Sequence, residues 1–184
     1  LIKNDFFVTG ADLLPHRQRA FRDMGGQLCR SPSEVGRDAD AVFIMVMTGE
    51  EVKNVIFGDD GLLTSMPKGS AIILSATIKP QEAREIGALM VGSGIDLIDT
   101  PVSGGFPGAQ SGSLTLMAAA PDSTLDAFLP YLEAVSANIH RVGDKPGDGQ
   151  TVKACLQSLI GAQFSATFEA AALAAKAGVS GQVL

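Results

Sequence analysis

The sequence predicts an α/β protein in which short buried strands alternate with helices, followed by a single long helix. Three observations predict this fold class. Apolar runs of strand length, rich in valine and isoleucine, recur along residues 1–143 and are separated by segments with helical spacing. The 21 glycines and few aromatic residues are typical of a sheet with many tight turns between strands and helices. Residues 150–177 contain no proline and many alanines, which gives this stretch a high helix propensity.

A linker rich in structure-breaking residues divides the chain into two predicted parts. Residues 143–149, with the sequence GDKPGDG, combine three glycines with a proline and two aspartates. We therefore assign residues 1–143 to an α/β domain. Residues 144–184 are assigned to the linker and to a long helix.

Composition restricts the classes of function that need consideration. The formal net charge of −6 argues against nucleic acid or an anionic membrane surface as a partner. No apolar run reaches the roughly 18 residues of a membrane span, and no signal peptide is recognisable. Two cysteines and two histidines, far apart in the sequence, predict neither a disulfide framework nor a metal site. We therefore expect a cytoplasmic protein that binds no metal.

The first recognisable strand covers residues 6–11 and ends at Asp12, for which two interpretations stay open. An acidic residue at this point of a nucleotide-binding fold hydrogen-bonds the adenine ribose 2′-hydroxyl of NAD and repels the 2′-phosphate of NADP. Alternatively, Asp12 caps the helix that begins near Pro15. Arg17, one turn later, leaves binding of NADP open.

One expected motif is missing before this strand. A dinucleotide-binding Rossmann fold begins with a strand and a G-x-G-x-x-G loop, and the sequence contains neither before residue 6. Either the chain is not a nucleotide-binding fold, or it is a fragment without the first strand and its loop. We favour a Rossmann-type sheet lacking its first strand, because the later elements keep the expected order. Since that strand is central, its neighbours would keep unpaired backbone groups, and a further hypothesis is that the fragment binds no ligand.

Strand–helix units follow in the order expected of a parallel sheet. Ser31 predicts the N-cap of a short helix, with Glu34 in the capping-box position. Residues 41–47, AVFIMVM, predict a strand that is buried on both faces. Further along the chain, a strand is expected over residues 71–74 and helices over residues 50–57 and 80–93.

The carboxyl ends of these strands carry the candidate cofactor-binding residues, because ligands of open α/β sheets lie beyond such ends. Met47 and Thr48 follow the strand over residues 41–47, and Thr77 follows the strand over residues 71–74. Packing in the core is the alternative for Met47 and Thr48. Capping of the next helix is the alternative for Thr77.

A glycine-rich turn follows the next buried strand, which covers residues 94–99. Pro101 ends the strand ladder, and Ser103, Gly104 and Gly105 follow after one more residue, Val102. Backbone N–H groups of such a turn can hold a carboxylate or a phosphate, and the serine hydroxyl adds one donor. The alternative is a flexible surface loop. Two more strands, over residues 114–119 and 138–142, are expected around a helix over residues 122–134.

The sequence from Asp99 to Met117, D-x-P-V-S-G-G-x-x-G-A-x-x-G-x-L-T-x-M, resembles the substrate-binding signature of the β-hydroxyacid dehydrogenases. This family includes 3-hydroxyisobutyrate, tartronate semialdehyde, 6-phosphogluconate and L-threonate dehydrogenases, and the resemblance extends over nearly all of the chain. It implies that Ser103, Gly104 and Gly105 hold the carboxylate of a small hydroxy acid. It also implies that the stretch containing Thr77 lines the nicotinamide site and that the long helix after residue 149 opens an all-helical domain.

Residues 147–153, GDGQTVK, resemble the catalytic signature of the same family, G-x-G-x-x-x-K. The resemblance implies that Lys153 is the acid/base and that Gln157, on the same helix face, orients the substrate hydroxyl. Without the motif, a lysine on a helix is usually only a solvated side chain. The family pattern continues K-x-x-N-N or K-x-x-N-Q, whereas this sequence has Leu156 at the first amide position. This departure affects the choice of substrate more than the chemistry.

The leading hypothesis is an NAD-dependent dehydrogenase of small hydroxy acids, with NADP as a second candidate cofactor and a homo-oligomer expected at full length. Residues 75–78 and 143–147 look most like the sugar-acid branch that includes L-threonate dehydrogenase. A four-carbon sugar acid is therefore favoured over 3-hydroxyisobutyrate. The alternative is a non-catalytic module of the same fold that binds a nucleotide or supports assembly. Relatives without alcohol oxidation typically lack the lysine, so Lys153 favours the enzyme.

Overall fold

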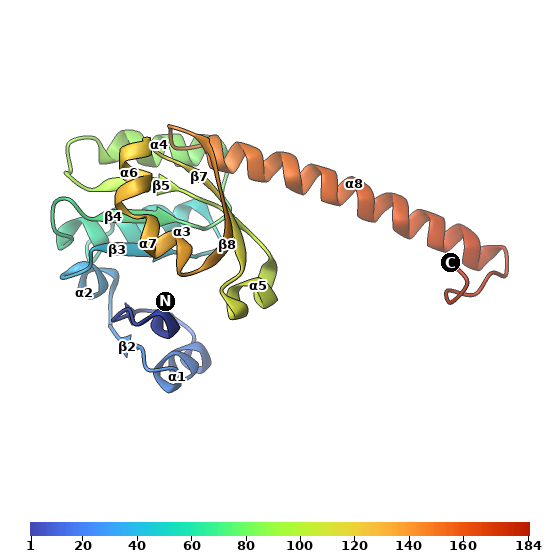
Figure 1. Cartoon of the computed structure of the whole chain (residues 1–184), viewed down its shortest axis with the longest axis horizontal. Helices are drawn as coiled ribbons and strands as arrows, with labels where there is room; N and C mark the ends of the chain where they lie inside the picture. Colours follow the sequence, from blue (N-terminus) through green and yellow to red (C-terminus); the bar gives the residue numbers. More distant parts are fainter.

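The computed structural model describes residues 1–184 and confirms the predicted α/β sheet (Figure 1). One sheet has six strands in the order β3-β4-β5-β7-β6, with β8 paired to β7, and β1 and β2 form a separate parallel pair. Strands β3, β4 and β5 are parallel to one another, whereas β5 and β6 are antiparallel to β7. The strands are β1 (Thr9–Gly10), β2 (Gln27–Leu28), β3 (Ala41–Ile44), β4 (Ala71–Leu74), β5 (Asp96–Asp99), β6 (Val102–Ser103), β7 (Leu114–Ala119) and β8 (Ser136–Gly143).

Helices cover both faces of the six-stranded sheet (Figure 1). The alternation of strand side chains produces this arrangement: Ile72 and Leu74 pack on one face with α3, α4 and η2, and Ile73 packs on the other with α6 and α7. The helices are η1 (Ile2–Asn4), α1 (Pro15–Asp23), α2 (Pro32–Gly36), α3 (Gly49–Phe57), η2 (Leu62–Thr64), α4 (Pro80–Met90), α5 (Gly105–Ser111), α6 (Asp122–Ala127), α7 (Leu129–Glu133) and α8 (Asp148–Lys176).

The strand predicted over residues 41–47 is shorter in the structure, and the prediction was wrong for its last three residues. Strand β3 ends at Ile44, and the side chains of Met45 and Met47 are largely exposed. The reason is the length of the neighbouring strand, because Ile44 pairs with Leu74, the last residue of β4. Beyond this pair, no neighbour continues the ladder. The strand predicted over residues 6–11 is likewise reduced to β1, which pairs on one side only.

Proline and glycine positions decide the remaining differences. The helix predicted over residues 122–134 is divided into α6 and α7 at Phe128, where Pro130 follows in the first turn of α7. The glycine-rich turn after β5 contains a two-residue strand, β6, and the short helix α5. Ser31 caps α2 as predicted, with its hydroxyl accepting the Glu34 N–H.

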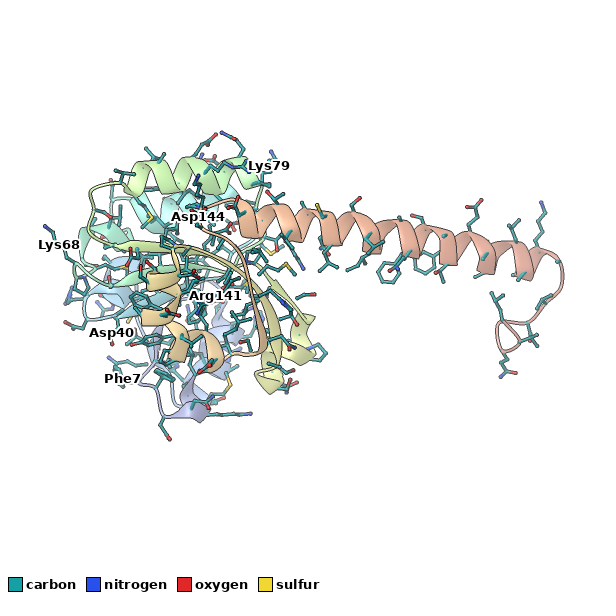
Figure 2. The ribbon with its side chains drawn as sticks, turned by 45° about the horizontal axis from the view of Figure 1, so that its top comes forward. Phe7, Asp40, Lys68, Lys79, Arg141 and Asp144 are labelled. Atoms are coloured by element: carbon teal, nitrogen blue, oxygen red, sulfur yellow. The ribbon has the colours of Figure 1, made fainter.

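The β1–β2 pair and strand β3 face each other across a cavity of about 990 Å³ that is lined mostly by apolar side chains. Residues 6–12 line one side and residues 37–46 the other; Phe7 and Asp40, from opposite sides, lie at the same end of the molecule (Figure 2). The Asp40 carbonyl accepts the Ala71 N–H of β4, and the Ile44 carbonyl accepts the N–H groups of Ser75 and Ala76, which follow β4. Backbone groups alternate in direction along a strand, so those of Phe43 point the other way, toward the cavity. The edges of β1 and β3 that face this cavity therefore carry backbone groups without a strand partner.

Helix α8 leaves the α/β part of the chain and extends into solvent (Figure 1). All side chains of residues 161–170 are exposed, and the rings of Phe164 and Phe168 stack on each other. Strand β8 ends at Gly143 and α8 begins at Asp148. A division into two domains at residue 143 stays a prediction. No helix of the structure combines the length and the apolarity needed to cross a membrane.

The unpaired edge of β3 predicts an alternating pattern of amide hydrogen exchange. The Val42 and Ile44 amides face β4 and are expected to exchange slowly, whereas the Phe43 amide faces the cavity and should exchange at least about tenfold faster. Exchange measured by NMR on the 184-residue chain checks this. Equal protection of all three amides would show that another segment or a second copy pairs with this edge.

Candidate active site

The N-terminus of α8 is held by a carboxylate that lies on a different element. Asp99, the last residue of β5, is fully buried, and its Oδ2 accepts hydrogen bonds from the N–H groups of Gly147 at 2.7 Å and Gln150 at 3.2 Å. These N–H groups belong to the first turn of α8, which has no partners of its own within the helix. A negative charge at this end is also favoured by the helix dipole. Asp99 therefore acts as the N-terminal cap of α8.

Gln150 completes a buried polar network around this cap. Its side-chain Nε2 donates to Asp99 Oδ1 at 2.9 Å and to the Ala76 carbonyl at 3.0 Å. Its Oε1 accepts the Ile78 N–H at 3.0 Å. Burial raises the pKa of the Asp99 carboxyl, and the hydrogen bonds from Gln150 and Gly147 oppose this increase in part. The network therefore joins the end of β5, the turn after β4 and the first turn of α8.

The two glycines that precede Lys153 allow α8 to begin against the strand ends. Gly147 has φ +96°, a left-handed conformation that favours glycine, and a Cβ there would lie 2.7 Å from the Pro80 carbonyl oxygen. A Cβ on Gly149 would lie 2.5 Å from the Met117 carbonyl oxygen. The G-x-G part of the motif is thus explained by close packing of backbones.

Lys153 lies one turn after Gln150 and is only 7% exposed. It forms no ion pair, and burial lowers the pKa of its ammonium group from the usual 10.5. Gln157 lies four residues later on the same helix face and is exposed. The structure therefore places the two predicted residues side by side at the start of α8, with the amine in the desolvated position.

The predicted carboxylate-binding turn lies at the end of β6. Gly104 and Gly105 have φ angles of +125° and +57°, so the turn depends on residues without a Cβ. Ser103 is half-buried, and no hydrogen bond occupies its hydroxyl. The Pro101 carbonyl accepts the Met117 N–H, and the backbone of Gly149 packs on the Pro101 ring. The turn at Ser103, two residues after Pro101, therefore begins close to the first turn of α8.

Asp12 already has local partners in the structure. Its Oδ1 accepts the Leu14 N–H at 2.8 Å, and its Oδ2 lies 3.8 Å from Arg17 Nη1. The helix cap proper is Leu14, so Asp12 stabilises the turn that precedes α1. The carboxylate lies beyond the end of β1 and borders the large cavity. The interpretation of Asp12 as the cap of α1 is therefore wrong, and its contact with a ribose hydroxyl stays a prediction.

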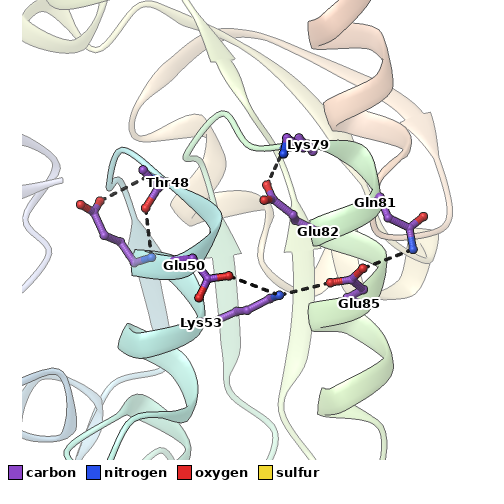
Figure 3. Close-up of polar contacts among 8 residues, drawn as sticks. Thr48, Glu50, Lys53, Lys79, Gln81, Glu82 and Glu85 are labelled. Atoms are coloured by element: carbon purple, nitrogen blue, oxygen red, sulfur yellow. Dashed lines mark hydrogen bonds and ion pairs between the residues drawn. The ribbon is translucent and has the colours of Figure 1, made fainter.

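Thr48 has a structural role that the sequence analysis did not assign to it. Its hydroxyl accepts the Glu51 N–H at 3.2 Å, and the Glu51 carboxylate accepts the Thr48 N–H at 3.3 Å, which forms a capping box at α3 (Figure 3). Lys53 on the same helix contacts Glu85 on α4 at 3.2 Å and so bridges the two helices.

The other two cofactor candidates have no such role. Met47 is 84% exposed, and Thr77 is exposed and forms no side-chain hydrogen bond. Capping of α4 by Thr77 is thereby wrong, since Lys79 is the cap residue of that helix. In the parallel register of the sheet, Ile44 pairs with Leu74, and Leu74 pairs with Asp99. The carboxyl ends of β3, β4 and β5 therefore lie side by side. Met47, Thr48 and Thr77 therefore share one edge of the sheet with Asp99.

The sequence analysis missed Asp99 and Gln150 as functional-site residues. The sequence contains an indication for each of them. Asp99 is a charged residue at the end of an apolar strand, and Gln150 is a polar residue within the glycine-rich motif, where close packing is expected. Ser75 and Thr100, the next residues after β4 and β5, were missed as well. Both side chains are buried and their hydroxyls have no hydrogen-bond partner.

Comparisons with known proteins agree with this geometry. Residues 1–143 match the family model described as the NAD binding domain of 6-phosphogluconate dehydrogenase. An L-threonate dehydrogenase of Escherichia coli O6:H1 is 36% identical over 171 residues, which are 92% of this chain and 57% of that protein. A 3-hydroxyisobutyrate dehydrogenase of Pseudomonas aeruginosa is 34% identical over 184 residues, the whole chain and 61% of that protein.

A solved structure shows the same arrangement of elements. The crystal structure of a 3-hydroxyisobutyrate dehydrogenase from Salmonella typhimurium superposes with a TM-score of 0.88 at 36% identity. The match covers 97% of this chain and 62% of that one. The chain thus spans about three fifths of the length of the relatives it matches.

Burial of Lys153 predicts a pH-dependent effect on stability. The folded chain holds the Lys153 proton less tightly than the unfolded chain, so the charged lysine costs stability below its folded-state pKa. This cost falls as the pH rises to 10.5, where the amine loses its proton in both states. Lys153→Met is expected to raise the Tm at pH 7 by about 2–4 °C, and the gain should shrink toward pH 10.5.

Thermal unfolding followed from pH 7 to pH 10 measures this effect. Lys176→Met, at the exposed end of α8, is the matched control and should change the Tm little at any pH. A lower Tm for Lys153→Met at pH 7 would contradict the inferred cost of burying the ammonium group.

Proposed function

The chain belongs to the family of the NAD binding domain of 6-phosphogluconate dehydrogenase, and on this premise we propose that it oxidises the hydroxyl group of a small hydroxy acid. The family resemblance read from the sequence is confirmed at this level. The activity of the whole protein is proposed here, because the chain covers 57% to 62% of the matched relatives. The single observation that carries the proposal is the buried, unpaired Lys153 at the start of α8.

Lys153 is proposed to accept the proton of the substrate hydroxyl. A general base works best when its pKa lies near the working pH, and burial moves the pKa of Lys153 downward from 10.5. No carboxylate competes for the amine, so the neutral form stays free to take a proton. In the reverse direction, the ammonium group returns the proton and stabilises negative charge on the substrate oxygen.

The turn after β6 is proposed to hold the substrate carboxylate. Ser103 offers an unoccupied hydroxyl, and Gly104 and Gly105 allow a ligand to approach the backbone N–H groups closely. Gln157, one turn beyond Lys153, is proposed to orient the reacting hydroxyl. Leu156 is half-buried beside it and offers no polar group. The site would therefore recognise a carboxylate and one hydroxyl.

The residues present fit the ribose and nicotinamide ends of NAD. Asp12 Oδ2 has only the 3.8 Å contact with Arg17, which leaves it free to accept a ribose hydroxyl. Its charge favours NAD over NADP, with NADP still a candidate. Met47, Thr48 and Thr77 line the edge at which β3 and β4 end. A G-x-G-x-x-G motif for the pyrophosphate is not among these residues. NAD, when bound, supplies the acceptor for the hydride.

A second candidate function is assembly, and the exposed part of α8 favours it. Leu159, Phe164, Phe168 and Leu173 are all more than half exposed on a helix that carries few charges. A helix that is apolar around its circumference is normally covered by other helices. The homo-oligomer expected from the sequence would use this surface. Assembly and catalysis are compatible, because Lys153 lies at the other end of the helix.

The role of Lys153 is tested in the full-length protein. Lys153→Ala is expected to lower kcat at least about a hundredfold, because a positioned proton-transfer group contributes on this scale. The KM for the dinucleotide should change little, since the amine acts on the substrate hydroxyl. Lys176→Ala is the control and should retain kcat. Turnover close to that of the unchanged protein would remove Lys153 from the mechanism.

The substrate is tested with a panel of threonate, erythronate, glycerate and 3-hydroxyisobutyrate, each with NAD and with NADP. A four-carbon sugar acid with NAD is expected to give the highest kcat/KM, because residues 75–78 and 143–147 resemble the sugar-acid branch, although Leu156 offers no partner to a second hydroxyl. Leu156→Asn restores an amide at this position and should raise kcat/KM for the hydroxylated acids by about 5- to 100-fold, the range of one buried hydrogen bond. A higher kcat/KM for 3-hydroxyisobutyrate than for both four-carbon acids would overturn the choice of substrate.

A further inference from the structure

Asp99 and Gln150 form a polar pair that is more completely buried than any part of the proposed substrate site. Asp99 is 0% exposed and Gln150 is 1% exposed. Each side-chain oxygen and nitrogen of the pair has a partner, with distances of 2.7 to 3.2 Å. A buried network of these hydrogen bonds fixes one arrangement of the two side chains and their partners, because any other arrangement would leave some buried polar atoms without a partner.

The segments joined by this pair are the two that carry the proposed chemistry. Gln150 bonds to the Ala76 carbonyl and the Ile78 N–H, the backbone groups on either side of Thr77. The same residue lies one helical turn before Lys153 and bonds to Asp99 through its own N–H. A single side chain therefore fixes the cofactor-side turn against the helix turn that presents the amine.

Stability alone does not account for this arrangement. Asp99 is buried without a cationic partner, and burial raises the pKa of its carboxyl, so ionisation of Asp99 costs free energy. Capping of the α8 N-terminus requires only one oxygen of Asp99. The second oxygen, and the whole Gln150 side chain, serve to connect α8 to the turn after β4.

We propose that Asp99 and Gln150 are positioning residues, which set Lys153 at a fixed place relative to the Ala76–Ile78 turn and keep water away from its amine. This inference rests on the proposed function, because it assigns the turn to the cofactor side and Lys153 to proton transfer. Neither residue touches the reacting atoms in this scheme. Both act through Lys153 and through the turn that contains Thr77.

The test compares three variants of the full-length protein. Gln150→Met keeps the length of the side chain and removes all three of its hydrogen bonds. Asp99→Asn keeps the shape and one acceptor oxygen, so it is the milder second variant if Gln150→Met does not fold. Gln163→Met is the matched control, because it places the same substitution at an exposed position of α8 whose side chain has no hydrogen bond.

Two readouts separate positioning from a merely structural role. The first is the pKa of Lys153, followed by NMR through its Cε chemical shift without any turnover. The charged groups around the first turn of α8 and the Ala76–Ile78 turn are Asp99 on β5, Lys79 and Arg84 at α4, and Asp148 on α8. Burial is the cause of the lowered pKa of Lys153. The second is the separate change of kcat and KM with the preferred hydroxy acid.

Gln150→Met is expected to raise the pKa of Lys153 toward its usual value. The Ala76–Ile78 turn is then no longer bonded to α8, and water reaches the amine. It should lower kcat about 10- to 100-fold, the scale of a displaced catalytic group, with a smaller change in KM. Asp99→Asn should change both quantities in the same direction by less, and Gln163→Met should change neither.

A folded Gln150→Met variant with an unchanged Lys153 pKa and unchanged kcat would overturn the inference. The NMR readout also separates this inference from the proposed function. A raised Lys153 pKa in a protein that oxidises no hydroxy acid would support the positioning role and refute the dehydrogenase. An unchanged Lys153 pKa in an active dehydrogenase would refute the positioning role alone.

Discussion

The buried carboxylate of Asp99 at the end of β5 is the interaction on which the arrangement of this molecule depends. It receives the free N–H groups at the start of α8, and it does so at a point where three parallel strands end in line. A helix N-terminus and a carboxylate attract each other strongly when water is excluded. The direction in which α8 leaves the sheet, and hence the place of Lys153, follows from this contact.

Burial has opposite effects on the two charged groups of this region. It raises the pKa of the Asp99 carboxyl and lowers that of the Lys153 amine, so both charged forms are disfavoured in the fold. Such groups persist only where the surrounding structure is stable enough to hold them. Here that structure is the pair of apolar clusters on the two faces of β4, whose four residues are completely buried.

Two parts of the chain lack the contacts that would bury their apolar surface. The β1–β2 pair and β3 turn unpaired backbone groups toward a cavity of about 990 Å³. The distal half of α8 exposes Phe164, Phe168 and Leu173 to solvent. Unpaired strand edges and apolar helix surfaces of this kind normally pack against other protein. The central strands β4, β5 and β7 have no such deficit, and the polar pair of Asp99 and Gln150 lies at their end.

The sequence by itself determined the α/β class, the long helix after residue 147 and the family, because apolar periodicity, helix propensity and fixed motif spacing are local properties of the chain. The motifs also single out Lys153 and the Ser103–Gly105 turn as candidate site residues, whose roles stay predictions. It did not determine where β3 ends, since that depends on the length of β4, nor that Thr48 caps α3.

Above all, the link between Asp99 and Gln150 was hidden in the sequence. These residues are 51 positions apart, and Gln150 reaches Ala76 and Ile78 across 74 and 72 positions. No local pattern encodes hydrogen bonds between such distant segments. Only the tertiary structure decided them, because the packing of α8 on the strand ends is what excludes water from these polar groups and obliges them to bond to one another.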